Sequence, residues 1–302
     1  MSHPPYRTFR TTVERITPLS PSFTRITFTG DDLHFFGTDC LDQRIKLIIP
    51  FEDGSYTDFG QFDEAQGMYD WYRRWRELPD EQRNPLRTYT VRAVRPEASE
   101  IDVDFVLHGT EGPASAWATA ARQGDELAIV GPDSRAEEAP GGLEWKPGDA
   151  TSLLIAGDET AMPAICSIVE SLPVHVSGEV FLEVPTSADV LPLPAPDGVR
   201  VTWLARDGSA HGELLTAAVH GWGERRDAAG SAAAGEDPGE AQASDEDILW
   251  EVPEDASGTE YAWLAGEAGT ITALRRHLVR DLGLDRTSIA FMGYWRAGRA
   301  ES

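Results

Sequence analysis

The stretch Arg87-Thr88-Tyr89-Thr90-Val91-Arg92 is the most informative in this 302-residue chain. Its β-branched residues favour an extended strand, in which successive side chains point to opposite faces. Arg87 and Tyr89 then share one face with Val91, while Thr90 and Arg92 lie on the other. A guanidinium can bind a diphosphate with two parallel hydrogen bonds, and a tyrosine can lie flat against a planar ring whose edge a hydroxyl can contact. A flavin dinucleotide contains all three groups, but for this hexapeptide alone an exposed strand with ordinary charges is the better interpretation.

A second candidate segment lies shortly after the first. Residues 101–108 alternate like a strand and lead into Gly109-Thr-Glu-Gly-Pro-Ala-Ser-Ala-Trp117. Pro113 suits the first position of a helix, and a helix start presents unpaired N–H groups and a positive dipole end that bind phosphate. Glycines let the backbone approach a ligand, and Ser115 can donate its hydroxyl. The alternative is a plain helix cap. The predicted phosphate-binding turn comprises His108, Gly109, Gly112, Pro113, Ala114 and Ser115.

Two different patterns divide the chain. Up to about residue 145, short alternating stretches such as Phe23-Thr-Arg-Ile-Thr-Phe-Thr29 predict an antiparallel β-barrel. From about residue 150, strands such as Ser152-Leu-Leu-Ile-Ala156 alternate with helices, which predicts a Rossmann-like parallel sheet. We therefore expect a barrel domain over 1–145 and an α/β domain over 150–302. An acidic, Ala- and Gly-rich segment over about 223–257 is predicted to be a disordered insert, with residues 248–252 a candidate for docking back.

These segments together resemble the flavin motifs of the siderophore-interacting proteins, which are NAD(P)H-linked ferric-siderophore reductases. The resemblance is carried by Arg87–Arg92, Asp104–Gly109, Gly112–Trp117, Gly157–Ile165, Trp263–Glu267 and Gly293–Gly298. It implies a ferredoxin-reductase-like arrangement, with a flavin-binding barrel for FAD and a second domain for NADPH or NADH. Arg87 and Arg92 are then cofactor-binding residues. Tyr89 and Thr90 become the residues at the reacting ring, where Tyr89 shields one face and Thr90 hydrogen-bonds an edge.

In the second domain, ligands are expected at the carboxyl ends of the parallel strands. Asp158, Thr160 and Ala161 follow the first of these strands at a helix start, where they can contact the coenzyme, although Asp158 could instead face the flavin domain. Arg206 follows the third strand and could bind the extra phosphate of NADPH. An ordinary surface cation is the alternative for Arg206, and Glu183 would instead suit the free ribose hydroxyl of NADH. The choice between the two coenzymes therefore stays open.

Three further places are predicted to contact a ligand. Gly266 and Glu267 follow a later strand near the expected nicotinamide position, with a helix cap as the alternative for Glu267. The resemblance implies that Tyr294 and Trp295, near the end of the chain, lie beside the flavin, with packing between the domains as the alternative. It also implies that Lys46 lies near the flavin edge, where an anionic ferric siderophore approaches, although a lysine in this pattern usually just faces solvent.

Composition excludes several function classes. The formal net charge of −25 argues against nucleic-acid binding. The chain has two cysteines without a CxxC motif and seven histidines without ligand spacing, so no metal site of its own is expected. No stretch resembles a signal peptide or a membrane-spanning segment, which predicts a cytoplasmic protein without membrane insertion.

The sequence thus predicts a cytoplasmic FAD-dependent reductase that takes electrons from NAD(P)H and passes them to Fe(III) in a ferric siderophore, releasing Fe(II). The cofactor carries this chemistry, so no side-chain acid or nucleophile is needed. Ferredoxin is a further candidate partner. Two alternatives remain open: a generic flavin or ferredoxin-type reductase on the same fold, and a siderophore-binding protein without redox activity.

Overall fold

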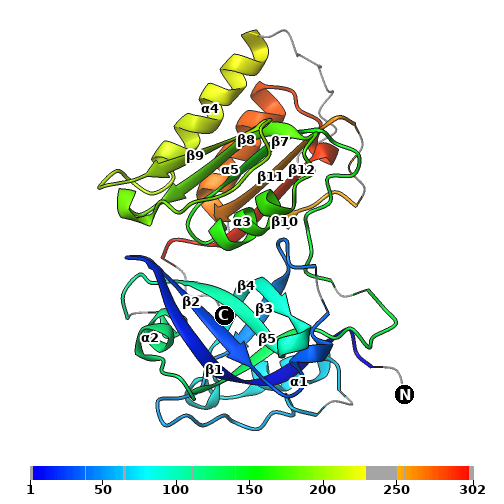
Figure 1. Ribbon diagram of the computed structural model, residues 1–302, viewed down its shortest axis with the longest axis vertical. Helices are drawn as coiled ribbons and strands as arrows, with labels where there is room; N and C mark the ends of the chain where they lie inside the picture. The colour runs from blue at the N-terminus through cyan, green and yellow to red at the C-terminus, as the bar shows by residue number, and fades with distance from the viewer. Residues whose placement is uncertain are drawn as a thin grey trace. The chain divides into compact units, whose positions relative to one another are not determined.

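The computed structural model describes residues 3–37, 39–63, 66–110, 112–139, 141–228, 250–254, 256 and 258–298. The chain divides into two compact units, Met1–Leu143 and Glu144–Ala300 (Figure 1). Among the described helices, none is both long and apolar enough to cross a membrane.

The first unit is a closed antiparallel barrel, as the sequence predicted. Its strands are β1 (Tyr6–Ser20), β2 (Phe23–Thr29), β3 (Arg44–Ile48), β4 (Leu86–Arg95), β5 (Glu100–Val106) and β6 (Glu126–Pro132). Around the barrel they follow the order β1-β2-β5-β4-β3-β6. Sequence alternation did not identify β1, whose pattern is interrupted by register shifts after Val13 and after Pro18. Three short 3₁₀ helices, η1 (Leu33–Phe35), η2 (Asp80–Gln82) and η3 (Pro96–Ala98), lie in the connections.

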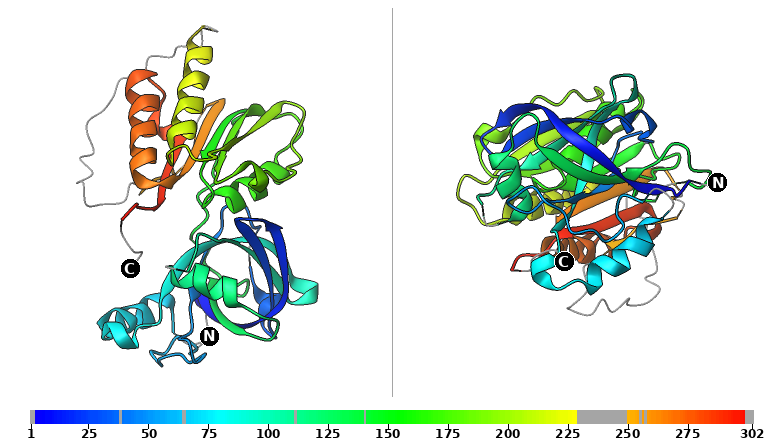
Figure 2. Two further views of the ribbon diagram at one scale, coloured as in Figure 1. Left: turned by 90° about the vertical axis from the view of Figure 1, so that its left-hand side faces the viewer. Right: turned by 90° about the horizontal axis from the view of Figure 1, so that it is seen from below.

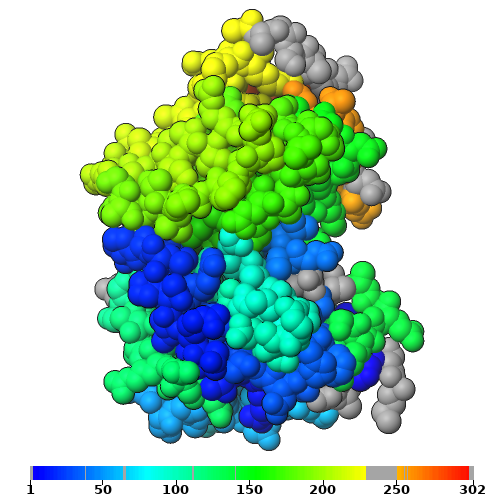
Figure 3. Space-filling view, in the orientation of Figure 1, coloured from blue at the N-terminus to red at the C-terminus, as the bar shows by residue number. Residues whose placement is uncertain are grey.

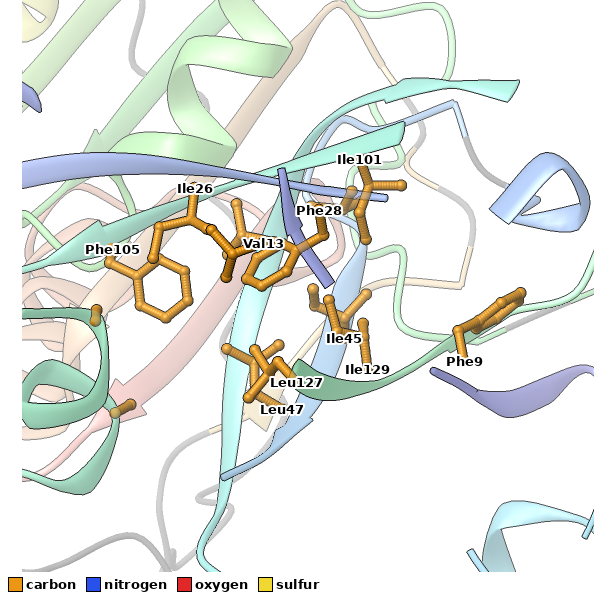
Figure 4. Close-up of a cluster of buried hydrophobic side chains, with 14 of the residues drawn as sticks. Phe9, Val13, Ile26, Phe28, Ile45, Leu47, Ile101, Phe105, Leu127 and Ile129 are labelled. Atoms are coloured by element: carbon orange, nitrogen blue, oxygen red, sulfur yellow. The ribbon is translucent and has the colours of Figure 1, made fainter. Parts of the chain in front are cut away.

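Apolar side chains from all six strands fill the barrel. Figure 4 shows five side chains of this core: Ile26 and Phe28 of β2, Phe105 of β5, and Ile45 and Leu47 of β3. All five side chains are at most 1% exposed. Since burying such a side chain is worth about 1.5–3 kcal/mol of transfer free energy, this core holds the strand ends in place.

A second cluster of buried side chains lies beneath α1 (Met68–Glu77). Trp71 and Trp75 are one helical turn apart and both are buried, whereas Tyr69 on the other side of the helix is 90% exposed. The Trp75 indole donates to the carbonyl of Asn84 over 2.8 Å. Burial of two aromatic rings at i and i+4 explains why this segment is a helix.

The second unit is a six-stranded sheet in the order β10-β12-β11-β7-β8-β9. Its strands are β7 (Ser152–Gly157), β8 (Ser177–Val184), β9 (Val199–Ala205), β10 (Trp250–Glu251), β11 (Glu260–Glu267) and β12 (Ile289–Trp295). The predicted parallel sheet is confirmed for every pair except β10 with β12, which are antiparallel. The edge strand β10 lies within residues 248–252, which the sequence proposed would dock back.

Helices cover both faces of this sheet. The helical segments are α3 (Met162–Ser171), η4 (Ser187–Asp189), α4 (Glu213–Ala228), α5 (Ala268–Arg276), the π-helix η5 (His277–Asp281) and η6 (Arg286–Ser288). α4 and α5 lie side by side on one face (Figure 2), where Leu215 and Ile271 pack against Leu154 and Leu264, and α3 lies on the other. α4 continues to Ala228, so the first six residues of the predicted insert are helical, contrary to expectation. Residues 229–249 of that insert lie outside the described residues.

Candidate functional site

The two faces of β4 differ as the two-residue period predicts. Tyr89 pairs with Ile45 and Arg87 pairs with Leu47, both of which belong to the barrel core. Val91 is fully buried in the same core. Arg87, Tyr89 and Val91 therefore share the inner face of the barrel wall, whereas Thr90 lies on the outer face opposite Arg44. Thr90 is only 5% exposed.

The helix that follows β5 is α2 (Pro113–Ala120), as the sequence predicted. The Phe105 ring lies 4.7 Å from the Tyr89 ring and 6.0 Å from that of Trp117 on α2, measured between centroids. Phe105 thus contacts both predicted flavin segments, which brings β4 and α2 to the same region of the barrel. This proximity is what a ligand with both a planar ring and a diphosphate requires.

The amino end of α2 has no side-chain cap among the described residues. Gly112 is its N-cap, and Pro113 and Ala114 begin the helix. Gly109 has a φ of 91°, a backbone conformation that other residues rarely adopt. First-turn N–H groups without a side-chain cap are the donors that bind phosphate elsewhere.

Ser115 makes two hydrogen bonds within the turn that precedes α2. Its Oγ donates to the carbonyl of Gly109 over 2.6 Å and accepts from the amide of His108 over 3.2 Å. The side chain is buried, and its single proton is used within the turn. Ser115 therefore shapes the turn between β5 and α2, and its role in cofactor binding stays a prediction.

Lys46 and Arg92, two cations that the sequence predicted to contact a ligand, lie on the outer face of the barrel. Lys46 on β3 pairs with Thr88, and its Nζ donates to Thr88 Oγ1 over 2.6 Å. Arg92 lies at a register shift of β4, with Nε 3.8 Å from Asp104 Oδ2, and the same carboxylate pairs with Arg25. The outer surfaces of β1 and β2 (blue) and of β4 (cyan) are visible in Figure 3. The contact with Asp104 gives Arg92 a structural function, and its cofactor-binding role stays a prediction.

In the second unit, Asp158 joins the carboxyl ends of three neighbouring strands. It follows β7, is fully buried, and its Oδ1 accepts from the amide and hydroxyl of Thr160 at 2.9 and 2.5 Å. Its Oδ2 accepts from the amide of Glu267 at 2.8 Å, at the end of β11, and from the Trp295 indole at 2.9 Å, at the end of β12. The sequence placed Asp158 and Thr160 at a coenzyme site and Trp295 beside the flavin; in the structure, Thr160 and Trp295 both donate to the Asp158 carboxylate.

Two glycines, Gly157 and Gly266, leave the space that the side chains around Asp158 occupy. Gly266 has a φ of 152°, and a Cβ there would lie 2.7 Å from Asp158 Oδ2. A side chain at Gly157 would meet the Ala161 Cβ at 2.7 Å. Ala161 is fully buried, so its side chain packs inside the unit. Glycine at these positions is required by packing within the unit itself.

Glu267 is the N-cap of α5, which is the alternative that the sequence had left open. Its Oε2 accepts from the amide of Thr270 over 2.8 Å, and its Oε1 accepts from the amide of Ala297 over 3.3 Å. The ring of Tyr294 stacks on that of Trp250, 6.0 Å away, and meets the Trp263 ring edge-on. Glu267 and Tyr294 therefore both help to hold residues 294–297 against the sheet.

Arg206 lies between two carboxylates. Its Nη1 donates to Glu159 Oε2 over 2.7 Å and to Glu183 Oε1 over 3.1 Å, and its Nη2 donates to Glu159 Oε1 over 2.6 Å. Glu183 is fully buried and also accepts from the amides of Gly212 and Leu215 at the start of α4. Burial raises the pKa of Glu159, but the hydrogen bonds from Arg206 and His211 outweigh it and lower the pKa to about 2.

His211 is a site residue that sequence reasoning missed. Its Nε2 lies 3.3 Å from Asp158 Oδ2 and 3.6 Å from Glu159 Oε2, and its ring meets that of Trp295 edge-on at 5.0 Å. Burial lowers its pKa, but the two carboxylates outweigh this and raise the pKa to about 10. His211 stands in a loop without a motif, so only the fold reveals it. Asp158, Glu159 and His211 each offer one atom that could bind a metal ion, and these atoms lie within 4.8 Å of one another. Both carboxylates, however, already accept other hydrogen bonds.

A pH titration tests this arrangement. The folded-state pKa of His211 lies above its ordinary value of 6.5, so the ion pairs stabilise the fold fully below pH 6.5 and are lost as pH rises through about 10. We expect ¹⁵N-detected NMR of the imidazole to show His211 still protonated at pH 8. In Asp158→Asn, the His211 pKa should fall toward its ordinary value. A wild-type His211 that is neutral at pH 8 would contradict the ion pairing.

A surface hollow lies away from these residues. It has a volume of about 450 Å³ and is lined by Leu153, Gly178, Gly198, Arg200 and Trp222, among others. These residues lie near the amino ends of β7, β8 and β9. Parallel α/β sheets bind their ligands at the carboxyl ends, so the chemistry of Asp158 and Arg206 is the better guide to function.

The barrel residues fit a flavin dinucleotide. Arg87 Nη1 donates only to the carbonyl of Leu86, over 2.9 Å, and the guanidinium has no carboxylate partner among the described residues. Among the described residues, a cation without a counter-charge, an uncapped helix start and a half-buried aromatic ring lie on neighbouring elements, and these features suit a diphosphate and a planar ring. A Cβ at Gly109 would meet nothing within 4 Å, so the turn leaves open space beside the backbone.

Comparison with known proteins agrees with this geometry. Residues 12–136 match the siderophore-interacting FAD-binding domain, and residues 150–298 match the siderophore-interacting protein family. The structure of the siderophore-interacting protein SipS from Aeromonas hydrophila is similar, with 31% identity and a TM-score of 0.66 over 98% of this chain and 94% of SipS. Ferric vibriobactin reductase ViuB of Vibrio cholerae is 28% identical over 96% of this chain and 93% of ViuB.

A more distant structure shares the fold alone. The ferredoxin reductase in carbazole 1,9a-dioxygenase is 15% identical, with a TM-score of 0.56 over 96% of this chain and 70% of that chain. The fold is therefore of the ferredoxin-reductase type, with a barrel that matches an FAD-binding domain followed by an α/β unit. With both halves matched in order and a 31%-identical relative covered almost end to end, the chain belongs to the siderophore-interacting protein family.

Proposed function

We propose that this chain is a cytoplasmic FAD-dependent reductase that passes electrons from NAD(P)H through FAD to Fe(III) in a ferric siderophore, releasing Fe(II). The observation that carries the proposal is the convergence of Tyr89 and α2 on Phe105, together with an Arg87 that has no carboxylate partner in the part of the chain that the structure describes. The likeness to ViuB, which is named a ferric vibriobactin reductase, supports the choice of substrate.

The chain's own residues bind and orient the cofactor. Arg87 and the first-turn amides of α2 would hold the FAD diphosphate, because both offer hydrogen-bond donors with positive charge. Tyr89 would cover one face of the flavin ring, and Thr90 would hydrogen-bond its edge. FAD held there would supply the redox chemistry that no described side chain provides, namely transfer of an electron pair from a nicotinamide and of single electrons to iron.

In the second unit, the residues around Asp158 would position the pyridine nucleotide. The amino end of α3 and the ends of β7, β11 and β12 meet at this carboxylate. Trp295 and His211 border the same place through their contacts with Asp158. Because one buried anion fixes all these segments, the edge of the sheet is rigid before a coenzyme arrives, which lowers the entropic cost of binding.

Lys46 is the proposed contact for the siderophore. It lies on the outer face of β3 in a chain of net charge −25 that contains only two lysines. A positive charge there would attract a ferric chelate that carries negative charge, over a Debye length of about 10 Å. We expect Lys46→Ala to raise the KM for an anionic ferric siderophore about threefold, consistent with roughly 0.2–1 kcal/mol for an exposed charge pair, and to leave the KM for NAD(P)H unchanged.

Lys146, the other lysine, is exposed in the second unit and provides the matched control. Lys146→Ala should leave both constants unchanged. Raising the ionic strength should reduce the difference between wild type and Lys46→Ala, because salt screens exposed charges. Equal KM values for wild type and Lys46→Ala at low salt would remove Lys46 from the substrate site.

An anaerobic assay tests the function as a whole. The chain is reconstituted with FAD and supplied with NADH or NADPH and a panel of ferric catecholates and hydroxamates, while a ferrous-specific chromophore traps Fe(II). We expect Fe(II) to form only with coenzyme, FAD and a ferric siderophore together. Reduction of ferricyanide or a ferredoxin but of no siderophore would favour a generic reductase. Siderophore binding without FAD uptake would favour a non-redox binding protein.

A further inference from the structure

Arg206 is the residue on which the choice of coenzyme depends. In doubly wound sheets, an acid near the end of the second strand binds the ribose 2′-hydroxyl of NADH, or a nearby arginine accommodates the 2′-phosphate of NADPH. Here Glu183 is the penultimate residue of β8, and Arg206 directly follows β9, the neighbouring strand. Both kinds of residue are therefore present, so their contacts must decide between the coenzymes.

The contacts show that the positive charge of Arg206 is already neutralised. Both of its terminal nitrogens donate to Glu159, and one also donates to Glu183, at distances of 2.6–3.1 Å. The side chains of Arg206 and Glu159 are each only 13% exposed. Partly buried, two-point pairs of this kind are much less screened than surface pairs. A phosphate that approached Arg206 would have to compete with two carboxylates that are already in place.

The charges around Arg206 also oppose a phosphate. Asp158, Glu159 and Glu183 are three carboxylates that face two cations, Arg206 and His211, which leaves one net negative charge. Asp207, which directly follows Arg206 in the sequence, is exposed, and its Oδ1 accepts a hydrogen bond from the amide of Ser187 over 3.0 Å. A phosphate monoester carries about −1.5 to −2 charge at neutral pH. A ribose hydroxyl, in contrast, is neutral and can donate a hydrogen bond to a carboxylate.

We propose that the carboxyl ends of β8 and β9 select NADH over NADPH, and that Glu159 sets this preference by neutralising Arg206. The inference rests on the proposed function and adds the identity of the coenzyme. Glu159 acts through Arg206 and is a specificity-determining residue without a catalytic role. Its position directly after Asp158 places it at the helix start that follows β7, where the coenzyme is expected.

Binding of two redox-inactive fragments tests the preference. ADP-ribose and 2′-phospho-ADP-ribose differ only in the 2′-phosphate and lack the nicotinamide, so no hydride transfer contributes. Isothermal titration calorimetry is performed on the full chain reconstituted with FAD. We expect ADP-ribose to bind at least about tenfold more tightly, since like charges brought together at a binding site are disfavoured by at least the ~1.4 kcal/mol that this factor represents.

Glu159→Gln retains the size of the side chain and removes its charge. We expect it to shrink the ratio of the two affinities by about tenfold, chiefly by tighter binding of the phosphorylated fragment. Glu159→Ala should act in the same direction. Thermal melting of both variants is the check that they fold. The control is Glu179→Gln, because Glu179 also pairs with an arginine, Arg225, at 2.8 Å, but this pair is more exposed and lies near the amino end of β8. It should leave the ratio unchanged.

Equal or tighter binding of 2′-phospho-ADP-ribose to the wild type would overturn the preference. An unchanged ratio in both Glu159 variants would remove Glu159 as its cause. Either result can occur while FAD uptake and siderophore reduction remain intact, so the two proposals fail separately. If neither fragment binds, the inference is also wrong, and the anaerobic assay with NADH and NADPH decides independently whether the reductase function stands.

Discussion

Apoprotein carrying Arg87→Ala should bind FAD about a hundredfold more weakly than the wild type. Arg87 is a cation on β4 without a carboxylate partner among the described residues, so its free charge is available to the FAD diphosphate. Hydrogen bonds to charged groups are worth about 1.5–3 kcal/mol each, and about 2.7 kcal/mol corresponds to a hundredfold in affinity. Titration of the apoprotein with FAD, followed by the change in flavin fluorescence, measures the effect.

Two further variants test whether the loss of FAD affinity is specific to the guanidinium group of Arg87. Arg87→Lys retains the charge but loses the planar fork, so its affinity should fall between those of wild type and Arg87→Ala. Arg15→Ala removes a 52%-exposed arginine of β1 that lies 3.5 Å from Glu100, and it should bind FAD like the wild type. FAD affinity of Arg87→Ala within about twofold of wild type would refute the placement of the diphosphate at Arg87.

The second large effect concerns the stability of the α/β unit. Asp158→Asn should destabilise this unit by about 3–5 kcal/mol, the usual cost of breaking a buried ion pair by removing one partner. The amide nitrogen would replace an acceptor oxygen that now receives hydrogen bonds, and His211 would lose its counter-charge. Native-state hydrogen exchange measures the change, because amides of β7 and β11 report on this unit while barrel amides serve as an internal reference.

The chain contains a matched control for this substitution. Asp285 accepts from the amide and hydroxyl of Thr287, just as Asp158 does from those of Thr160, but Asp285 is exposed. Asp285→Asn should therefore cost less than about 1 kcal/mol. Trp295→Phe removes a single donor to Asp158 and should cost about 1 kcal/mol. If Asp158→Asn and Asp285→Asn proved equally mild, the joining role of Asp158 would be wrong.

Local sequence patterns predicted the elements of the fold well. The two-residue period of β4 correctly separated Arg87, Tyr89 and Val91 from Thr90, because alternation of side chains is a property of the strand itself. Gly112 and Pro113 correctly marked the start of α2, because proline and glycine act on their own backbone dihedrals. The α/β rhythm after residue 150 predicted the parallel sheet, although α4 extends further into the insert than composition suggested.

Long-range partners were beyond the reach of such patterns. Arg206 was predicted to be an ordinary surface cation or a ligand of the NADPH phosphate, and its pairs with Glu159, 47 positions away, and with Glu183 were not predicted. Ser115 was read as a ligand donor, yet its proton is used by Gly109. His211 carried no signal at all. The partners of Arg206 and His211 depended on which strands became neighbours, whereas the partner of Ser115 depended on how the turn after β5 folds.

The sequence by itself determined that a flavin-type barrel precedes a parallel α/β unit, since strand period, helix starts and turn residues act over a few neighbouring positions. Only the tertiary structure decided which charges remain available. The order β12-β11-β7-β8-β9 brings Asp158, Glu159, Glu183, Arg206 and His211 to one edge of the sheet. There burial weakens solvent screening, so each cation is matched with the carboxylates that lie nearest in space.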